Sequence, residues 1–177
     1  GVLINMKGYL LAAAFSVLPL CAQVSLKQAT DRISVDIDGQ PFTEFFISAD
    51  FNKPFLHPLR SATGKVVTRY FPMDLVEGEN RDHPHHRGLW FTHGDVNGVD
   101  FWMNETRDGN KGRVVLRKIT ALESGKRQGV IAARFEWLGP KGEMLVNEDR
   151  RMVFYSDKKL RTIDFDITLI AVEKVKF

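Results

Sequence analysis

The sequence predicts an all-β fold, an antiparallel β-sandwich, on three observations. Several segments alternate apolar and polar residues, which is the period of a strand that buries one face. Clusters of Gly, Pro, Asp and Ser separate these segments, and such clusters form the turns between antiparallel neighbours. Outside residues 1–22, no segment carries the apolar stripe of an amphipathic helix. Long strands joined by short turns are typical of a meander that folds into a sandwich.

A β-hairpin is expected near the start of this sandwich. Residues 32–38 alternate apolar and polar positions, so that Ile33, Val35 and Ile37 share one face. An Asp-Gly dipeptide follows, which favours the tight turn of a hairpin. Residues 42–47 then return as the partner strand.

Four longer strands are expected in the second half of the chain, at residues 113–124, 130–138, 143–155 and 160–172. The last of them alternates over four pairs of positions, with one apolar face made of Ile163, Phe165, Ile167 and Leu169. This regular period of two predicts a sheet with one solvated face.

Residues 1–22 have the pattern of a signal peptide. A short cationic start precedes an apolar run, and small residues end it, with a cut expected after Ala22. We therefore expect a secreted or periplasmic protein, with residues 1–5 upstream of the true start. Residues 23–177 are expected to form a single β-sandwich domain. The sequence still has strand character at Phe177, so we expect this domain to be truncated at its C-terminus.

The composition excludes several classes of function. Of the 177 residues 44% are hydrophobic, and 25 Lys+Arg against 22 Asp+Glu give a formal net charge of +3. This small excess argues against a nucleic-acid partner. The single cysteine excludes a disulfide framework and a Cys-rich metal site. No apolar run after residue 22 reaches the ~20 residues of a membrane span, so we expect no span in residues 23–177. The partner that we expect is a small-molecule or carbohydrate ligand.

The stretch 50–112 is irregular and too long for an ordinary connection, which points to function. All five histidines lie in it. The densest group is RDHPHHRGLWF at residues 81–91. If this stretch is extended, His83 and His85 point to one side and His86 to the other.

Three interpretations of the histidines stay open. An H-x-H pair on a strand offers two imidazoles to one metal, here a divalent or copper ion. The candidate metal ligands are His83, His85, His57 and His93. Alternatively, the imidazoles bind a ligand or move protons, because the pKa of histidine lies near neutrality. The third interpretation is structural, with Pro84 and Gly88 setting a tight turn.

Polar and aromatic groups around the histidines suit an organic ligand. Arginines form forked hydrogen bonds to oxygen atoms, carboxylates carry protons, and tryptophans stack on a ring. The candidate catalytic residues are His57, His83, His85, His86, Glu77 and Asp82. The candidate ligand-binding residues are Arg60, Arg69, Arg87, Trp90, Asp95 and Trp102. Lys53 is a further donor and Glu105 a further acceptor, whereas Phe91 and Phe101 are expected in the core.

Four runs of this region resemble the bacterial PmoA-like family, labelled methane oxygenase PmoA. They are KPFLHPLRS at 53–61, GKVVTR at 64–69, DHPHHRGLWF at 82–91 and GDVNGVDFW at 94–102. The resemblance implies an exported protein of unestablished function, longer than this chain. It also implies, by analogy of fold, part of a larger sandwich like that of sugar mutarotases.

The function predicted from these observations is an exported enzyme that acts on a carbohydrate or related polyhydroxy ligand through the His, Arg and acid cluster. Two alternatives stay open. One is a metal-binding protein of the oxygenase type, holding Cu, Fe or Zn, as the family label implies. The other is a non-catalytic sugar-binding module that uses Trp90 and Trp102.

Overall fold

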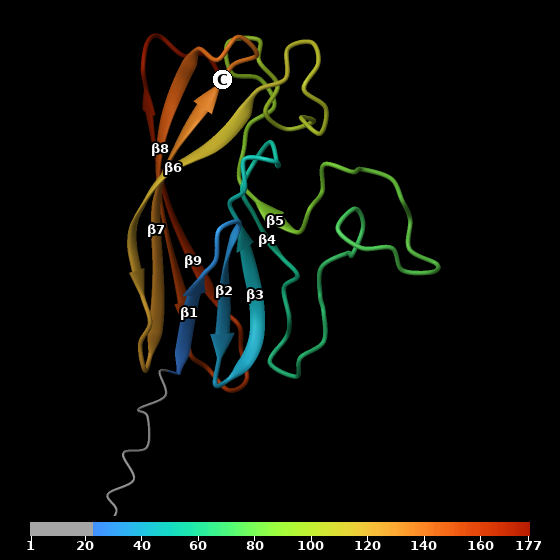
Figure 1. Ribbon diagram of the computed structural model, residues 1–177, viewed down its shortest axis with the longest axis vertical. Helices are drawn as coiled ribbons and strands as arrows, with labels where there is room; N and C mark the ends of the chain where they lie inside the picture. Colours follow the sequence, from blue (N-terminus) through green and yellow to red (C-terminus); the bar gives the residue numbers. More distant parts are fainter. Residues whose placement is uncertain (1–22) are drawn as a thin grey trace, which may run out of the picture.

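The protein is an all-β sandwich of two antiparallel sheets, described here from a computed structural model (Figure 1). The structure describes residues 23–177, and the predicted signal peptide lies outside them. The strands are β1 (Val24–Gln28), β2 (Arg32–Ile37), β3 (Gln40–Phe46), β4 (Phe55–His57), β5 (Leu89–Trp90), β6 (Arg113–Glu123), β7 (Gln128–Leu138), β8 (Met144–Tyr155) and β9 (Ile163–Ala171). One sheet has the order β1-β2-β3-β4-β5 and the other β6-β7-β8-β9. Each sheet is therefore a meander, as predicted.

The predicted hairpin is confirmed as β2 and β3. Ile33, Val35 and Ile37 are all fully buried, so the alternation in the sequence does mark the inner face. The register shifts by one position between Val35 and Asp36, where a β-bulge interrupts the ladder.

The four long strands of the second half are confirmed as β6 to β9, and their ends differ from the expected ones by at most three residues. In β9 the apolar positions are half-buried and the intervening acidic and threonine positions exposed. Sequence periodicity alone was sufficient here, because each strand is long and each turn contains the residues that turns prefer.

The core lies between the sheets and is rich in aromatic side chains. Phe45 meets Phe135 edge to face with ring centroids 6.2 Å apart, and Phe42 meets Phe154 in the same way at 6.3 Å. The β1 end of one sheet is tied to the other by Val24, whose N–H donates to the Gly125 carbonyl at 2.9 Å. Burial of these large rings supplies most of the driving force for folding.

Three short strands were not predicted, namely β1, β4 and β5. A strand of two or three residues is too short to show a period, so only pairing with its neighbour defines it. β4 and β5 are the important ones, because the long segment between them swings out from the five-stranded sheet before returning (Figure 1). This segment and the loop after β5 carry four of the five histidines, and His57 ends β4.

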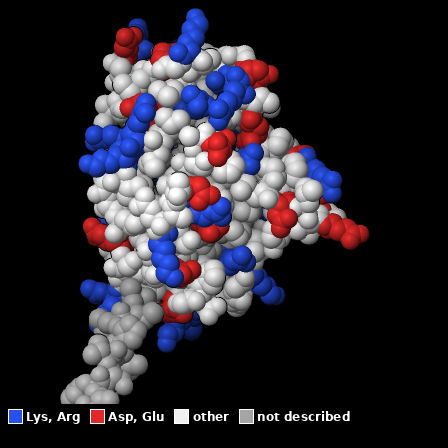
Figure 2. All heavy atoms as spheres, in the orientation of Figure 1, with Lys and Arg blue, Asp and Glu red and all other residues white. Residues whose placement is uncertain are grey.

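Charges of both signs are mixed on the face shown in Figure 2, with no extended surface of one sign. Within residues 23–177 the structure contains no helix long and apolar enough to cross a bilayer.

Candidate functional site

A tight turn brings three of the predicted histidines together. The His86 N–H donates to the His83 carbonyl at 2.9 Å, with Pro84 at the second position of the turn, where its fixed φ is preferred. His83 has a positive φ of 48°. The expectation of an extended stretch is therefore wrong: His83 lies over His86, because the proline promotes a turn instead of a strand.

The three imidazoles form a compact group, called here the histidine stack (His83, His85 and His86). His83 and His86 are stacked with ring centroids 5.0 Å apart and an interplanar angle of 30°. His85 meets His86 edge to face at 4.3 Å. His85 is buried, whereas the His83 side chain is 56% exposed, so the stack runs from the protein interior to solvent.

Two tryptophans continue the stack on its His86 side and form the tryptophan platform (Trp90 and Trp102). The His86 ring lies 5.0 Å from Trp90 and 6.2 Å from Trp102, and the two indoles are 5.3 Å apart. Trp102 is 41% exposed, so part of its surface is accessible to a ligand. The Trp90 Nε1 is buried without a hydrogen-bond partner among residues 23–177.

Lys53 lies behind the platform and holds it in place. Its Nζ donates to the Trp102 carbonyl at 2.6 Å and to Asn104 Oδ1 at 2.9 Å, and it lies 5.1 Å from the centre of the Trp90 ring. The side chain is only 1% exposed. Burial lowers the pKa of Lys53 to about 8, and the nearby positive charge of Arg87 adds to this, while Glu105 opposes it.

Arg87 is already engaged within the protein. Its Nε and Nη2 donate to Glu105 Oε2 at 3.0 and 2.5 Å, and its guanidinium lies 5.1 Å from the centre of the Phe51 ring. Glu105 in turn lies 4.0 Å from Lys53 Nζ. Arg87 therefore has a supporting role, because its forked donors are occupied, and its ligand-binding role stays a prediction.

The electrostatics of the stack favour the neutral forms of His85 and His86. Burial lowers the pKa of both His85 and His86, and the positive charges of neighbouring histidines and Lys53 lower them further. On the outer side, His83 Nδ1 lies 2.8 Å from Asp82 Oδ2, a contact that lowers the pKa of the Asp82 carboxyl. Asp82 Oδ1 also accepts a hydrogen bond from Arg69 Nη2 at 3.2 Å. The predicted residues Asp82 and Arg69 therefore do join the stack.

His57 occupies separate surroundings. It is buried on β4 under Gly88, and burial lowers its pKa, followed by the charge of Arg60. Its Nδ1 has no hydrogen-bond partner among residues 23–177. His57 and Arg60 line a hollow of about 510 Å³ that also holds Tyr70 and Asp74. The charged residues that shift the pKa of His57 differ from those that shift the pKa values of His85 and His86. His57 and Arg60 therefore belong to a separate site, the hollow of about 510 Å³.

The remaining predicted residues lie apart from the stack. Glu77 is exposed and makes no hydrogen bond or ion pair within residues 23–177. Asp95 accepts the Gly98 N–H at 2.6 Å and so shapes its own turn. His93 meets Phe177 edge to face at 5.4 Å. Phe91 and Phe101 pack on the core residue Trp137, as predicted.

The side chains do not fit the predicted copper or divalent ion. Within residues 23–177 no group of three or more His, Cys, Asp or Glu side chains is placed to hold a metal ion. The imidazoles of the stack lie ring against ring, and His83 Nδ1 is occupied by Asp82. A metal site needs ring nitrogens that converge on one point.

A buried asparagine was missed by the sequence analysis. Asn104 is fully buried, and its Nδ2 donates to the carbonyls of Asn52 and Gly112 at 3.3 and 3.0 Å. It thereby joins the Asn52-Lys53 segment to the Trp102 loop. An isolated asparagine in a loop resembles any turn residue, so only its proximity to Trp102 could have drawn attention to it.

Comparison with known proteins gives one match. A model described as "Family of unknown function (DUF6807)" matches residues 32–177. No curated protein and no solved structure matches the chain.

Proposed function

Because the chain belongs to the DUF6807 family, whose function is unknown, we propose from its site chemistry that it acts on a carbohydrate or a related polyhydroxy ligand at the histidine stack and tryptophan platform. The observation that carries this proposal is the accessible surface of Trp102 directly beside the neutral imidazole of His86. We include export in this proposal, because residues 1–22 have the pattern of a signal peptide. Membership of the PmoA-like family stays a prediction.

The platform supplies what a sugar ring needs for recognition. The faces of a pyranose carry C–H groups that pack on an indole, and its edges carry hydroxyls that need hydrogen-bond partners. Neutral imidazoles both donate and accept hydrogen bonds, so His86 suits those hydroxyls. Lys53 and Asn104 keep the Trp102 loop in place before the ligand arrives, which reduces the entropic penalty of binding.

His86 is the best-placed group to move a proton. It lies between the other two histidines and the platform, within reach of a ring stacked on Trp102. Its lowered pKa keeps it unprotonated at neutral pH, so it can accept a proton from a substrate hydroxyl. The Asp82 carboxylate beside His83 stabilises any positive charge that develops on the outer imidazole.

Variants at two positions separate binding from catalysis. We expect Trp102→Ala to weaken about tenfold the binding of any sugar that the parent protein binds, since it removes the stacking surface. His86→Ala should abolish product formation while affinity changes less. Met103→Ala is the matched control, because Met103 is also exposed in the same loop but lies outside the stack and platform. Calorimetric titration measures binding, and chromatography of the reaction mixture detects product from a panel of sugars and glycosides.

The pH dependence of turnover gives an independent check. A reaction that needs neutral His86 falls to half its maximal rate only below pH 6.5, the ordinary pKa of histidine, because burial lowers the pKa of His86. A rate that has already halved at pH 6.5 contradicts the assignment of His86. If a sugar binds but no product forms, the tryptophan platform is still the binding site, but the proposed catalysis is refuted. The protein is then a sugar-binding module. Absence of binding throughout the panel would refute the proposal.

A further inference from the structure

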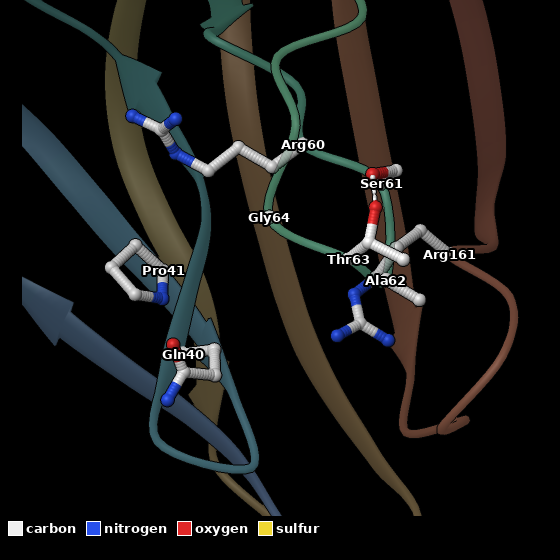
Figure 3. Close-up of a pocket in the computed structure, with 8 residues that line it drawn as sticks. All are labelled: Gln40, Pro41, Arg60, Ser61, Ala62, Thr63, Gly64 and Arg161. Atoms are coloured by element: carbon white, nitrogen blue, oxygen red, sulfur yellow. Dashed lines mark hydrogen bonds between the residues drawn. The ribbon is translucent and has the colours of Figure 1, made fainter.

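We propose a second binding site, specific for an anionic group, in a hollow at the edge of the sandwich, where the start of β3, the loop at residues 60–64 and the loop before β9 meet. The hollow has a volume of about 400 Å³ and is lined by Arg60, Arg161, a serine and threonine loop and the start of β3. Figure 3 shows Arg60 and Arg161 reaching it from two segments, with Gln40 and Pro41 across from them.

The charge of this hollow is wholly positive. Two arginines line it and no acidic residue does. Within residues 23–177 the Arg60 guanidinium makes no side-chain hydrogen bond and no ion pair. Arg161 donates only to backbone carbonyls of its own loop, those of Asp157 and Leu160. These bonds fix the direction of the Arg161 guanidinium but leave its charge without a counterion.

The nearest carboxylates have other partners. Glu44, across β3 from Arg60, already binds the Arg32 guanidinium with a separation of 3.0 Å. The Asp157 carboxylate accepts the N–H groups of the two residues that precede Arg161. An internal ion pair at the hollow is therefore absent within residues 23–177, whereas other arginines such as Arg117 and Arg134 have one.

The loop at residues 61–64 adds hydroxyl donors. Ser61 Oγ and Thr63 Oγ1 share one hydrogen bond of 2.9 Å, drawn as a dashed line in Figure 3. Whichever of them donates in that bond, the other hydroxyl keeps a hydrogen for a ligand. Arginine forks and hydroxyls are the groups that bind the oxygens of a carboxylate, sulfate or phosphate, and here both kinds line one hollow.

The volume identifies the kind of ligand. A hollow of about 400 Å³ exceeds what a lone inorganic anion fills and is of the size that takes a small organic molecule. The ligand is therefore a small molecule that carries an anionic group. This site is independent of the proposed function, because no residue that lines the hollow belongs to the histidine stack or the tryptophan platform.

Calorimetric titration of the full chain with four probes tests the proposal. The probes are sodium sulfate, sodium phosphate, glucuronate and, as the neutral counterpart of glucuronate, glucose, all at constant ionic strength. We expect one saturable site for at least one anion and none for glucose. Arg60→Gln and Arg161→Gln should each weaken anion binding about tenfold. Arg60→Gln loses no internal hydrogen bond, so its fold is expected to be retained, which circular dichroism checks.

The matched control is Lys158→Gln, which removes the same charge from the exposed loop that carries Arg161 but lies outside the hollow. It should bind the anion as the parent protein does. Equal weakening in this control would overturn the site in favour of general attraction by a positive surface. Undiminished binding in both arginine variants, or no saturable anion binding at all, would also overturn it. Binding of glucuronate but not of the inorganic anions supports the proposal and identifies an organic ligand.

Discussion

The charge of Lys53 gives the sharpest prediction about stability. The side chain is 1% exposed, and burial lowers its pKa from the ordinary 10.5 to about 8. The unfolded chain therefore keeps a proton on this amine over a pH range in which the folded protein has released it. Stability rises with pH wherever the unfolded state binds more protons, so we expect this residue to stabilise the protein increasingly between pH 8 and 10.5.

The size of the effect follows from the difference between the two pKa values. Each tenfold change in the proton affinity corresponds to about 1.4 kcal/mol, so the full rise is at most about 3.5 kcal/mol. Other lysines and tyrosines titrate in the same range and add their own slope. Lys53→Met removes the buried amine while keeping a similar volume, so the difference between the two proteins isolates the contribution of Lys53.

Urea unfolding at a series of pH values measures this difference, with the buried Trp137 as the fluorescent reporter. The free energy of unfolding of the parent should rise relative to that of Lys53→Met as pH goes from 7.5 to 10.5. Lys118→Met, at an exposed position of β6, is the control and should follow the parent at every pH. Parallel curves for the parent and Lys53→Met would refute the reasoning, since the amine would then have the same pKa in both states.

Two further predictions concern the framework of the sandwich, and both are measured by urea unfolding. Gly88→Ala should destabilise the protein by about 2 kcal/mol or more, because a Cβ there would lie 2.3 Å from the Leu56 carbonyl oxygen at a φ of 93°. Gly142 has a similar φ but open space around it, so Gly142→Ala should lower the free energy of unfolding clearly less. Equal decreases in the two variants would contradict the steric argument. Glu148→Gln should cost about 3–5 kcal/mol, because it leaves the buried Arg150 without its counterion. Adding Arg150→Met to that variant should restore most of the loss, and a double variant no more stable than Glu148→Gln would show that the ion pair is not its cause.

The alternation of apolar and polar residues was sufficient to predict the long strands but not the short ones. β8 and β9 repeat their alternation over enough residues to distinguish a strand from any other structure. β4 and β5, by contrast, are defined by three and two residues and exist only because they pair with each other and with β3. The site depends on these two strands, which explains why its geometry was the least predictable part.

The histidine stack illustrates the same limit within a single motif. The sequence predicts that His83 and His85 point to the same side, because side chains two residues apart do so in an extended backbone. Pro84 and the hydrogen bond from His86 to His83 replace that geometry with a turn. The turn keeps the His83 and His85 rings 5.6 Å apart and brings His86 against both, so the chemistry of the motif depended on one backbone bond.

The sequence by itself determined the fold class, the long strands and the region that carries the candidate site, because these follow from periods, turn residues and composition that act over short distances. Only the tertiary structure decided which polar groups meet. It separated His57 from the stack, joined Lys53 to the Trp102 loop through Asn104, and placed Arg60 beside Arg161. Those contacts join residues about 50 to 100 positions apart in the chain, and their formation depends on how two sheets pack, which local pattern does not encode.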